Sequence, residues 1–398
     1  MKLLVISHKE TWEDSAFPSG FSTKGGFPFQ MRALSELFDE TRILSLRRAS
    51  NPPSGLVPLN GNHLQVITLP EPKGHDLERK LRLMLHFPRW LITTWREVAK
   101  ADAVHAPLPG DLGTIGMMIA LLQKKPLFIR HCGRWGIPSS AFDRWLQRFL
   151  EHIANSRTVV MATGGADHPP SSRNPAISWI FSTALTAADL EKTNKAQLWQ
   201  TGEVLRLVTV GSLLPGKNLS ALIAALPEVR KRNPELSLEV IGTGWLLKDL
   251  QQQTRQLGLE EAVIFSGNLS HDEVMERLSQ SHVFVFPTLY EGFPKALLEA
   301  MACGLPIIAS PVSVIPRLLE GGAGVLLTGQ DATSIADAVS DLLSDPEKMA
   351  AMGCLARERA QSYTLERWRD EIGVRLSEAW GKPLKQESIE PDQGAELA

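Results

Sequence analysis

Short runs of β-branched and aliphatic residues alternate along the chain with longer stretches in which apolar residues recur at helical spacing. This alternation is typical of parallel sheets that are covered by helices on both faces. A helical pattern spans residues 29–38, and the strand-like runs of the first half are residues 3–7, 41–46, 64–69, 103–106, 126–130 and 158–162. We therefore expect an α/β domain over residues 1–190.

The same alternation starts again after residues 191–203, a polar stretch with the composition of a linker. The strand-like runs of the second half are residues 205–210, 238–241, 263–265, 283–286, 306–309 and 324–327. They predict a second parallel-sheet domain over residues 204–362. Because ligands of open α/β sheets bind beyond the carboxyl ends of the strands, we expect the active site in the cleft between the two domains.

The end of the chain departs from this pattern. Residues 363–382 have helical periodicity, but no strand follows them. This predicts a helix that crosses back and packs on the first domain. Residues 383–398 are polar and lack periodicity, so we expect a disordered tail.

Composition and charge narrow the classes of function. The 398 residues are 43% hydrophobic, and 42 Lys and Arg oppose 44 Asp and Glu, which gives a formal net charge of -2. Proteins that bind nucleic acid present a basic surface to the phosphates, so no nucleic-acid partner is expected. The three cysteines are far apart and lack metal-ligand spacing, which predicts reduced thiols in a cytoplasmic protein. No stretch is long and apolar enough to span a bilayer, whereas attachment to a membrane surface stays open.

The segment richest in chemistry is residues 283–304. An apolar strand is followed by a loop that carries Glu291, and Pro294 stands where a helix begins, because its fixed φ and missing N–H suit the first turn. The unpaired N–H groups and positive dipole end of this helix form a natural seat for a diphosphate. Taken alone, the spacing of Glu291 and Glu299 indicates only a strand-turn-helix unit with two solvated glutamates.

The complete segment resembles the Glu-x7-Glu motif of the retaining group-1 glycosyltransferases, including the run Glu-Ala-Met-Ala-Cys-Gly-Leu-Pro at residues 299–306. The resemblance spans most of the second half. It implies the GT-B fold, in which two Rossmann-like doubly wound domains face each other across a cleft. It also implies that Glu291 lies beside the donor sugar and that Glu299 holds the ribose hydroxyls. The residues implied to meet the diphosphate are Gly292, Phe293, Pro294, Lys295, Ala296 and Leu297.

A second family-like element is the strand and loop of residues 208–219. Similar proteins place an arginine directly after the glycine and a lysine a few residues later, which together neutralise the diphosphate. Lys217 matches this lysine, although an exposed helix start would also explain it, and Ser212 occupies the arginine position. The departure implies weaker donor binding, lost activity, or a substitute cation such as Arg130 or Arg134 from the first domain.

Glycine loops complete the implied donor site. Gly242 and the segment Gly267–Leu269 follow strands and resemble the loops that enclose the nucleobase in this family, although glycines after strands also serve as ordinary turn residues. Gly25 and Gly26 lie between the first strand and its helix, where the resemblance places a loop beside the donor diphosphate and the acceptor. The dinucleotide-binding fingerprint Gly-x-Gly-x-x-Gly is absent from that turn.

Two histidines follow strands of the first half. Many relatives carry a histidine next to a glycine that touches the donor sugar, and His131 is displaced by one residue from that register because Cys132 intervenes. Contact with the donor sugar and a hydrogen-bonded place in the interdomain wall are alternative interpretations of His131. We interpret His105 as structural.

Residues 78–100 form a basic amphipathic stretch. Leu, Phe and Trp residues separate Arg79, Lys80, Arg82, Arg89, Arg96 and Lys100. Such a stretch can lie in an anionic membrane interface, which would suit a lipid-linked or lipopolysaccharide acceptor. A surface helix with a solvated basic face gives the same pattern.

The resemblance implies transfer of a hexose-type sugar from a nucleoside diphosphate to an acceptor hydroxyl, with retention at the anomeric carbon. Synthesis of cell-surface polysaccharide, lipopolysaccharide or glycolipid is the expected context, with Glu291, Lys217 and His131 as candidate catalytic residues. The nucleoside-diphosphate sugar is a co-substrate, and no cofactor or metal is implied, since the donor segments contain no Asp-x-Asp motif. Two alternatives stay open: a sugar-nucleotide 2-epimerase, and a nucleotide-binding subunit with little catalytic activity.

Overall fold

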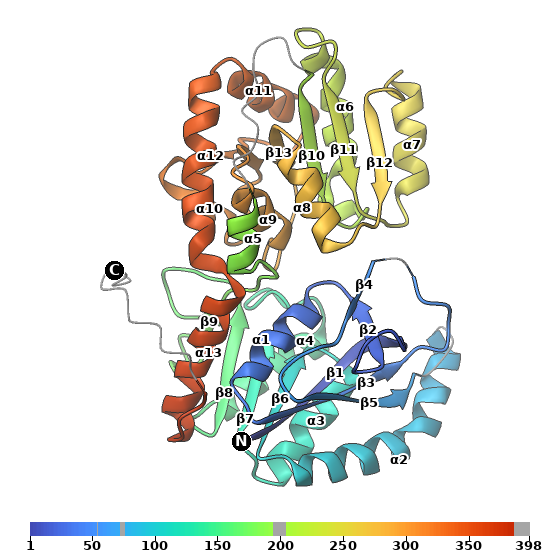
Figure 1. Cartoon of the computed structure of the whole chain (residues 1–398), viewed down its shortest axis with the longest axis vertical. Helices are drawn as coiled ribbons and strands as arrows, with labels where there is room; N and C mark the ends of the chain where they lie inside the picture. Colours follow the sequence, from blue (N-terminus) through green and yellow to red (C-terminus); the bar gives the residue numbers. More distant parts are fainter. Residues whose placement is uncertain (54, 72–75, 194–203, 386–398) are drawn as a thin grey trace.

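Two largely parallel sheets, one in each half of the chain, make up the protein (Figure 1). The computed structural model describes residues 1–53, 55–71, 76–193 and 204–385, and the side chains of residues 76–84 lie outside the described part. The strands of the first sheet are β1 (Lys2–Glu13), β2 (Phe21–Lys24), β3 (Glu40–Arg47), β4 (Leu56–Pro58), β5 (Leu64–Pro70), β6 (Ala103–Leu108), β7 (Leu127–His131), β8 (Thr158–Thr163) and β9 (Ser178–Ile180). The helices of this half are α1 (Phe27–Glu36), α2 (Asp76–Lys100), α3 (Asp111–Leu122), α4 (Ala141–Ile153) and α5 (Ala187–Lys192).

The second half has the same alternation of strands and helices. Its strands are β10 (Arg206–Val210), β11 (Ser237–Ile241), β12 (Val263–Gly267), β13 (Val283–Phe286), β14 (Ile307–Ala309) and β15 (Val325–Leu326). Its α-helices are α6 (Leu219–Arg230), α7 (Leu247–Gln256), α8 (His271–Ser279), α9 (Lys295–Ala302), α10 (Ile315–Leu318), α11 (Ala332–Leu343), α12 (Pro346–Ala360) and α13 (Leu365–Trp380). Short 3-10 helices are η1 (Pro215–Lys217), η2 (Glu320–Gly322) and η3 (Gln361–Tyr363).

Both sheets reverse their strand order near the middle. In the first, parallel strands run in the order β5-β3-β1-β6-β7-β8-β9, so the chain changes direction between β1 and β6. In the second, all strands are parallel in the order β12-β11-β10-β13-β14-β15, with the change between β10 and β13. Crevices at the carboxyl ends of such reversal points are where doubly wound sheets bind ligands.

The loop predicted between the first strand and its helix is partly strand. β1 continues beyond the expected residue 7 to Glu13, after a register shift against β3. Its end pairs antiparallel with β2, which pairs in turn with β4. Thr23 and Lys24 therefore belong to β2, and only Gly25 and Gly26 form the turn into α1. Periodicity did not reveal β2 and β4 because they contain four and three residues.

The first sheet is covered on both faces, since successive strand residues point to opposite sides. Leu4 and Ile6 of β1 pack in a core with α2, α3 and α4. Leu3 and Val5 pack in a second core with α1 and α13. The last helix of the described part thus completes the helical cover of the first sheet, beside which it lies in Figure 1.

The helix α13 has defined ends and packs on the first half through an apolar stripe. Thr364 caps the first turn by accepting a hydrogen bond from the N–H of Arg367, and Gly381 ends the helix in the left-handed region. Leu365 and Ile372 are buried against α1 and the sheet, and each contributes about 1.5–3 kcal/mol by leaving water.

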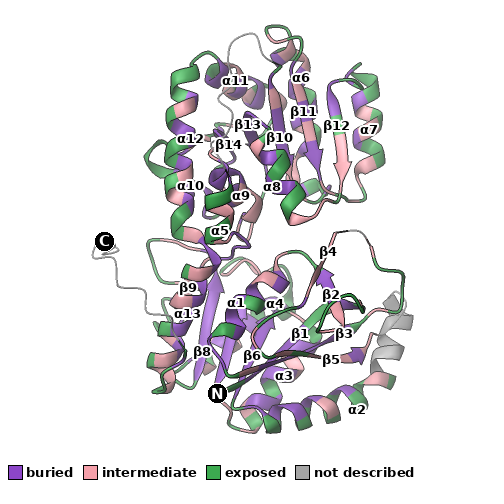
Figure 2. Ribbon diagram, in the orientation of Figure 1, coloured by how far each residue is buried: buried purple, intermediate pink, exposed green. Residues whose placement is uncertain are grey.

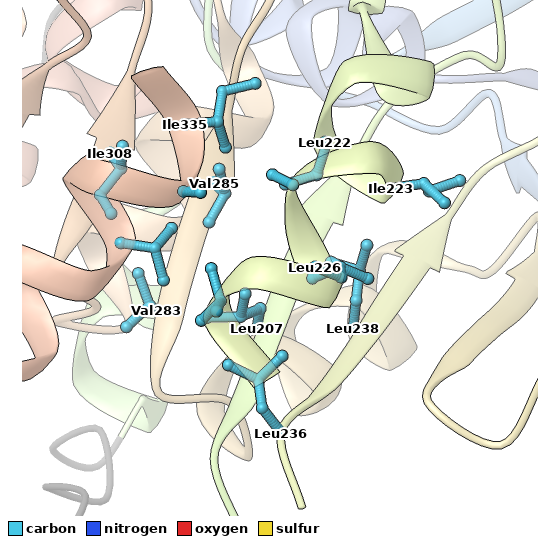
Figure 3. Packing of buried hydrophobic residues seen from close by; sticks show 14 of the residues in the cluster. Leu207, Leu222, Ile223, Leu226, Leu236, Leu238, Val283, Val285, Ile308 and Ile335 are labelled. Carbon is cyan, nitrogen blue, oxygen red and sulfur yellow. The ribbon is translucent and has the colours of Figure 1, made fainter. Parts of the chain in front are cut away.

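The second sheet buries aliphatic side chains under α6 and α11. Leu207 of β10 lies beside Leu226 of α6, and Val285 of β13 lies near Ile335 of α11 in the same core (Figure 3). On the opposite face, α9 packs with Val208 and Phe284 in a separate core. Strands buried on both faces become nearly continuous apolar runs, which is why the sequence pattern identified them. This packing holds the start of α9 at the carboxyl edge of β13.

The predicted linker, residues 191–203, lies mostly outside the described part, which stops at residue 193 and resumes at 204. Of the predicted tail, residues 383–398, only 383–385 are described, and Lys385 Nζ lies 2.9 Å from Asp39 Oδ1. Buried strands and exposed outer helix faces recur in both halves (Figure 2). None of the helices in the described part combines the length and apolar character that a bilayer span requires.

Candidate functional site

Three cavities lie in a row where the carboxyl ends of the two sheets meet. The Lys217 cavity has a volume of about 340 Å³, and its wall includes Ser212, Lys217, Tyr290, Glu291 and Arg134. The Arg130 cavity has a volume of about 420 Å³, and its wall includes Lys9, Gln30, Arg130, Thr163 and Lys295. The Glu299 cavity has a volume of about 160 Å³, and its wall includes Gly25, Asn268, Leu269, His271 and Glu299.

The cavities are contiguous. The Lys217 and Arg130 cavities share Pro109, Cys132 and Gly133. The Arg130 and Glu299 cavities share Gly26 and Lys295. An elongated ligand can therefore lie along all three, with both halves of the chain in contact with it.

Lys217 and Glu291 form an ion pair inside the first of these cavities. Their loops are tied together, because Thr288 Oγ1 and the N–H of Leu289 both donate to the carbonyl of Gly216, at 2.9 and 2.8 Å. The ammonium of Lys217 also lies 4.8 Å from the centroid of the Phe286 ring. The two predicted catalytic groups are thus brought together, and each compensates the charge of the other.

The start of α9 offers unpaired donors next to this ion pair. The sequence predicts Pro294 in the first turn of this helix. In the structure Pro294 is the N-cap residue, one position before the helix begins. Among the described residues, the N–H groups of Gly292, Phe293 and Ala296 have no hydrogen-bond partner. Gly292 and Phe293 line the cavities. The helix end can accordingly receive an anion there.

Glu299 lies further along α9 and is held by a histidine that sequence reasoning missed. His271 Nδ1 lies 3.5 Å from Glu299 Oε1, and His271 Nε2 lies 3.3 Å from Asp189 Oδ2. Burial alone would lower the pKa of His271, but the hydrogen bonds to Asp189 and Glu299 raise it to about 10. The imidazole is therefore protonated at neutral pH and holds the Glu299 carboxylate in place. No local signal could identify His271, because its position directly after the helix cap Ser270 suggests only a helix start.

Leu297, also predicted at the donor site, points the other way. Its side chain is fully buried in the core beneath α9, so only its backbone can face the cleft. Ala296 is partly exposed. The N–H of Leu297 donates to the carbonyl of Pro294 at 3.1 Å, whereas that of Ala296 has no partner among the described residues. A backbone contact with a diphosphate is therefore available at Ala296 and not at Leu297.

The loops after β10, β11 and β12 are hydrogen-bonded to one another. The N–H of Gly242 donates to the carbonyl of Gly267 at 2.7 Å, and that of Gly211 donates to the carbonyl of Ile241 at 2.9 Å. Gly242 has a φ of 139°, and a Cβ there would lie 1.9 Å from the carbonyl oxygen of Gly211. Only glycine permits this contact, which links the two loops predicted to enclose the nucleobase to the loop of Lys217. Leu269 lines the Glu299 cavity.

The glycine turn of the first half reaches across the boundary. Gly25 has a φ of 75°, and both Gly25 and Gly26 line the Glu299 cavity. A Cβ at Gly26 would lie 2.9 Å from Lys295 Nζ. The absence of a side chain at Gly26 leaves room for this ammonium, which α9 brings from the second half.

The two candidates to replace the expected arginine occupy different cavities. Arg134 lines the Lys217 cavity together with Ser212, and its Cζ lies 4.9 Å from the centroid of the Tyr290 ring. Arg130 lines the next cavity. Of these two candidates, only Arg134 therefore shares a cavity with Ser212.

The structure places His131 away from the cavity surface. Its side chain is fully buried, and Nε2 lies 3.4 Å from Asp143 Oδ1. Burial lowers the pKa of His131. Cys132 and Gly133, not His131, line the cavities, so the hydrogen-bonded interpretation fits better than contact with the sugar.

His105 is also buried, and its Nδ1 lies 3.0 Å from the carbonyl oxygen of Phe128. Burial and the charge of Arg130 lower the pKa of His105 to about 3. Within the described part of the chain, no group of three or more His, Cys, Asp and Glu side chains could hold a metal ion.

Comparison with known proteins identifies relatives for this arrangement. Residues 191–359 match the family described as Glycosyl transferases group 1. The GDP-mannose-dependent alpha-(1-6)-phosphatidylinositol monomannoside mannosyltransferase of Mycolicibacterium smegmatis is 35% identical over 181 residues, which cover 43% of this chain and 46% of the relative. The alpha-D-kanosaminyltransferase of Streptomyces kanamyceticus is 24% identical over 299 residues, which cover 70% of this chain and 77% of the relative. The chain thus matches about half the length of the mannosyltransferase.

Structural similarity extends over nearly the whole chain. Sucrose-phosphate synthase from Thermosynechococcus elongatus has a TM-score of 0.70 at 18% identity, with 96% of this chain and 99% of the other covered. WaaG, a glycosyltransferase involved in lipopolysaccharide biosynthesis, has a TM-score of 0.65 at 15% identity, with 96% of this chain and 100% of the other covered. The predicted fold of two facing parallel-sheet domains, the GT-B fold, is confirmed.

Proposed function

We propose, from the membership of residues 191–359 in the group 1 glycosyltransferase family, that the chain transfers a sugar from a nucleoside diphosphate to an acceptor hydroxyl with retention of anomeric configuration. One observation carries the proposal. Glu291, paired with Lys217, and Glu299, paired with His271, lie on either side of the unpaired N–H groups at the start of α9. Apart from Ala296, the residues that carry these groups line the same row of cavities.

In the proposed reaction, Glu299 accepts hydrogen bonds from the ribose, and the diphosphate lies against the N-terminus of α9. Lys217 and the helix N–H groups stabilise the charge that develops on the leaving diphosphate. The acceptor hydroxyl enters from the first half on the same face of the sugar and gives its proton to the departing diphosphate. Glu291 lies beside the sugar and holds Lys217 in position. The protein then acts by orientation and electrostatics, without a covalent nucleophile.

The acceptor class follows from the relatives and from the surface of the first half. One relative acts on a phosphatidylinositol monomannoside and one structural neighbour acts in lipopolysaccharide biosynthesis, according to their descriptions. We propose a saccharide or lipid-linked saccharide acceptor for this chain, as in glycolipid or cell-surface polysaccharide synthesis.

A peripheral contact with anionic membrane fits the helical layer of α2, α3 and α4. These helices cover one face of the first sheet, and large apolar side chains are exposed on the layer's outside: Leu85, Ile92 and Trp95 of α2, Met118 and Leu122 of α3, Phe142 and Trp145 of α4. Exposed basic residues of the same helices are Arg89, Arg96 and Lys100 of α2, Arg144 and Arg148 of α4. A surface that joins apolar anchors to basic side chains suits an anionic lipid interface. Of the basic stretch predicted from the sequence, Arg79, Lys80 and Arg82 have side chains outside the described part.

A thermal-shift panel of UDP, GDP, ADP and their sugars tests the donor site, because a ligand that binds only the folded protein raises Tm. We expect one nucleotide series to raise Tm, and the matching sugar nucleotide to be consumed when an acceptor is added. If no nucleoside diphosphate or sugar nucleotide raises Tm, the proposal is wrong.

Two other functions remain measurable alternatives. A 2-epimerase would convert the donor sugar without acceptor, and NMR of the sugar nucleotide after incubation would show the epimer. The feature that favours a subunit of low activity is Ser212, which removes a cation from the loop of Lys217. Binding of sugar nucleotide without transfer or hydrolysis would support that alternative.

A further inference from the structure

The Arg130 cavity concentrates positive charge that no carboxylate in its wall balances. Lys9 comes from β1, Arg130 from β7 and Lys295 from α9. The described residues that line the cavity include no Asp or Glu. Cations gathered in this way repel one another and favour a ligand of opposite charge.

Arg130 is the most constrained of the three. Its exposed fraction is 4%, and its Nη2 donates to Gln30 Oε1 at 2.8 Å. The guanidinium lies over the ring of Trp368, with Cζ 5.1 Å from the centroid. Among the described residues, its Nε and Nη1 have no hydrogen-bond partner. Burying an arginine whose N–H donors lack partners lowers the stability of the fold, unless a ligand accepts hydrogen bonds from those donors.

Two further groups in the cavity wall, the Thr163 hydroxyl and the Lys295 ammonium, can bind the same ligand. Thr163 Oγ1 is buried without a hydrogen-bond partner among the described residues. Lys295 extends its ammonium toward Gly26, and burial together with the charges of Arg130 and Lys9 lowers the pKa of Lys295 to about 8. An anion between these groups would relieve their repulsion.

We propose that Lys9, Arg130 and Lys295 form a binding site for a phosphoryl group, separate from the pair Lys217 and Glu291. The guanidinium of Arg130 offers a planar pair of donors that matches two phosphate oxygens. The two ammonium groups add the positive charge that offsets the remaining negative charge of a phosphate dianion. The volume of about 420 Å³ leaves room for the larger molecule that carries the group. That molecule is a phosphorylated acceptor, which enters from the first half, because the proposed function places the donor diphosphate against Lys217 and the start of α9. Only this assignment of the carrier rests on the proposed function.

The test measures binding of inorganic phosphate by ³¹P NMR titration and thermal shift. Arg130→Gln and Lys9→Gln should each weaken phosphate binding about tenfold or more, because each removes one charged donor. Lys9 is exposed, so Lys9→Gln tests the site without disturbing the stack on Trp368. Arg173→Gln is the matched control, since Arg173 is exposed and lines none of the three cavities. Circular dichroism spectra that match those of the unsubstituted protein establish folding.

A second titration identifies the carrier. If the donor diphosphate uses the site, saturating amounts of the nucleoside diphosphate with the largest thermal shift displace phosphate, and Arg130→Gln weakens that nucleotide. If the acceptor uses it, phosphate binds alongside the nucleotide, whose affinity in Arg130→Gln is unchanged. Phosphate affinities equal to wild type in both folded variants would overturn the proposal. Phosphate binding that depends on Arg130 in a protein that binds no nucleotide would leave this site standing and refute the glycosyltransferase proposal.

Discussion

The ammonium of Lys217 donates a hydrogen bond to Glu291 Oε1, which joins two loops that are 74 residues apart in the sequence. Lys217, the proposed contact of the diphosphate, is therefore also paired with Glu291, the proposed neighbour of the sugar. This pairing predicts opposite effects of the two residues on binding of the nucleotide.

The variant Glu291→Gln removes the negative charge that competes for Lys217. We expect the affinity for nucleoside diphosphate to be retained or increased, while kcat falls about 100-fold or more because the transition state loses an oriented group. Calorimetric titration and steady-state transfer measure the two quantities. Lys217→Met is the control and should weaken nucleotide binding. A large loss of nucleotide affinity in Glu291→Gln would contradict this account.

The variant Glu299→Ala removes the proposed acceptor of the ribose hydroxyls. Loss of hydrogen bonds to a charged group costs about 1.5–3 kcal/mol, so the affinity for nucleoside diphosphate should fall about 10- to 150-fold. Pyrophosphate, which has no ribose, should bind with unchanged affinity. Equal affinity of the variant and the wild type for the nucleotide would refute the ribose assignment.

Arg134 is expected to supply the charge missing at Ser212. The variant Arg134→Gln should weaken nucleoside diphosphate binding about tenfold. Adding Ser212→Arg to that variant should restore part of the affinity, because both cations line the same cavity. Calorimetric titration of the single and double variants checks this. If Arg134→Gln binds the nucleotide normally, Arg134 does not replace the arginine.

Protonation of His271 should make stability depend on pH. Its folded pKa of about 10 lies above the ordinary histidine pKa of 6.5, so its contribution to stability is fully present below about pH 6.5 and is lost as pH rises through about 10. Lys295 has a folded pKa lowered to about 8, so it changes the unfolding free energy in the opposite direction. Burial disfavours its charged form, and this cost disappears as pH rises and the ammonium loses its proton. Comparing wild type with His271→Gln separates the contribution of His271 from that of Lys295, because both proteins contain Lys295.

We expect the difference in unfolding free energy between wild type and His271→Gln to shrink between pH 7 and pH 10. Urea denaturation at several pH values measures it. A difference that stays constant over this range would show that the imidazole is not charged in the folded protein.

Membrane contact through the outer surface of α2, α3 and α4 predicts co-sedimentation with vesicles that contain anionic lipid. Trp145→Glu and Ile92→Glu should each reduce the bound fraction, since each places a negative charge among the exposed apolar side chains. Glu347→Gln on α12 is the control. Binding that does not change with the anionic lipid content would remove the membrane proposal.

The sequence alone determined the two parallel sheets and the strand, loop and helix of the proposed donor segment. Strands buried on both faces leave apolar runs such as residues 283–286, and a helix start leaves a proline such as Pro294. These are local patterns, in which each residue is constrained by its own backbone and by burial. The spacing of Glu291 and Glu299 belongs to the same class, because one loop and one helix set it.

Only the tertiary structure decided which side chains meet. His271 reaches Asp189 and Glu299 from another helix, and Arg130 lies with Lys295 although they belong to different halves of the chain. His131 is buried, while its neighbour Cys132 lines the cavities. Neither contact nor orientation is encoded in a periodic pattern, because both depend on how the two sheets and their helices pack against each other. The chemistry of the cleft is a property of that packing.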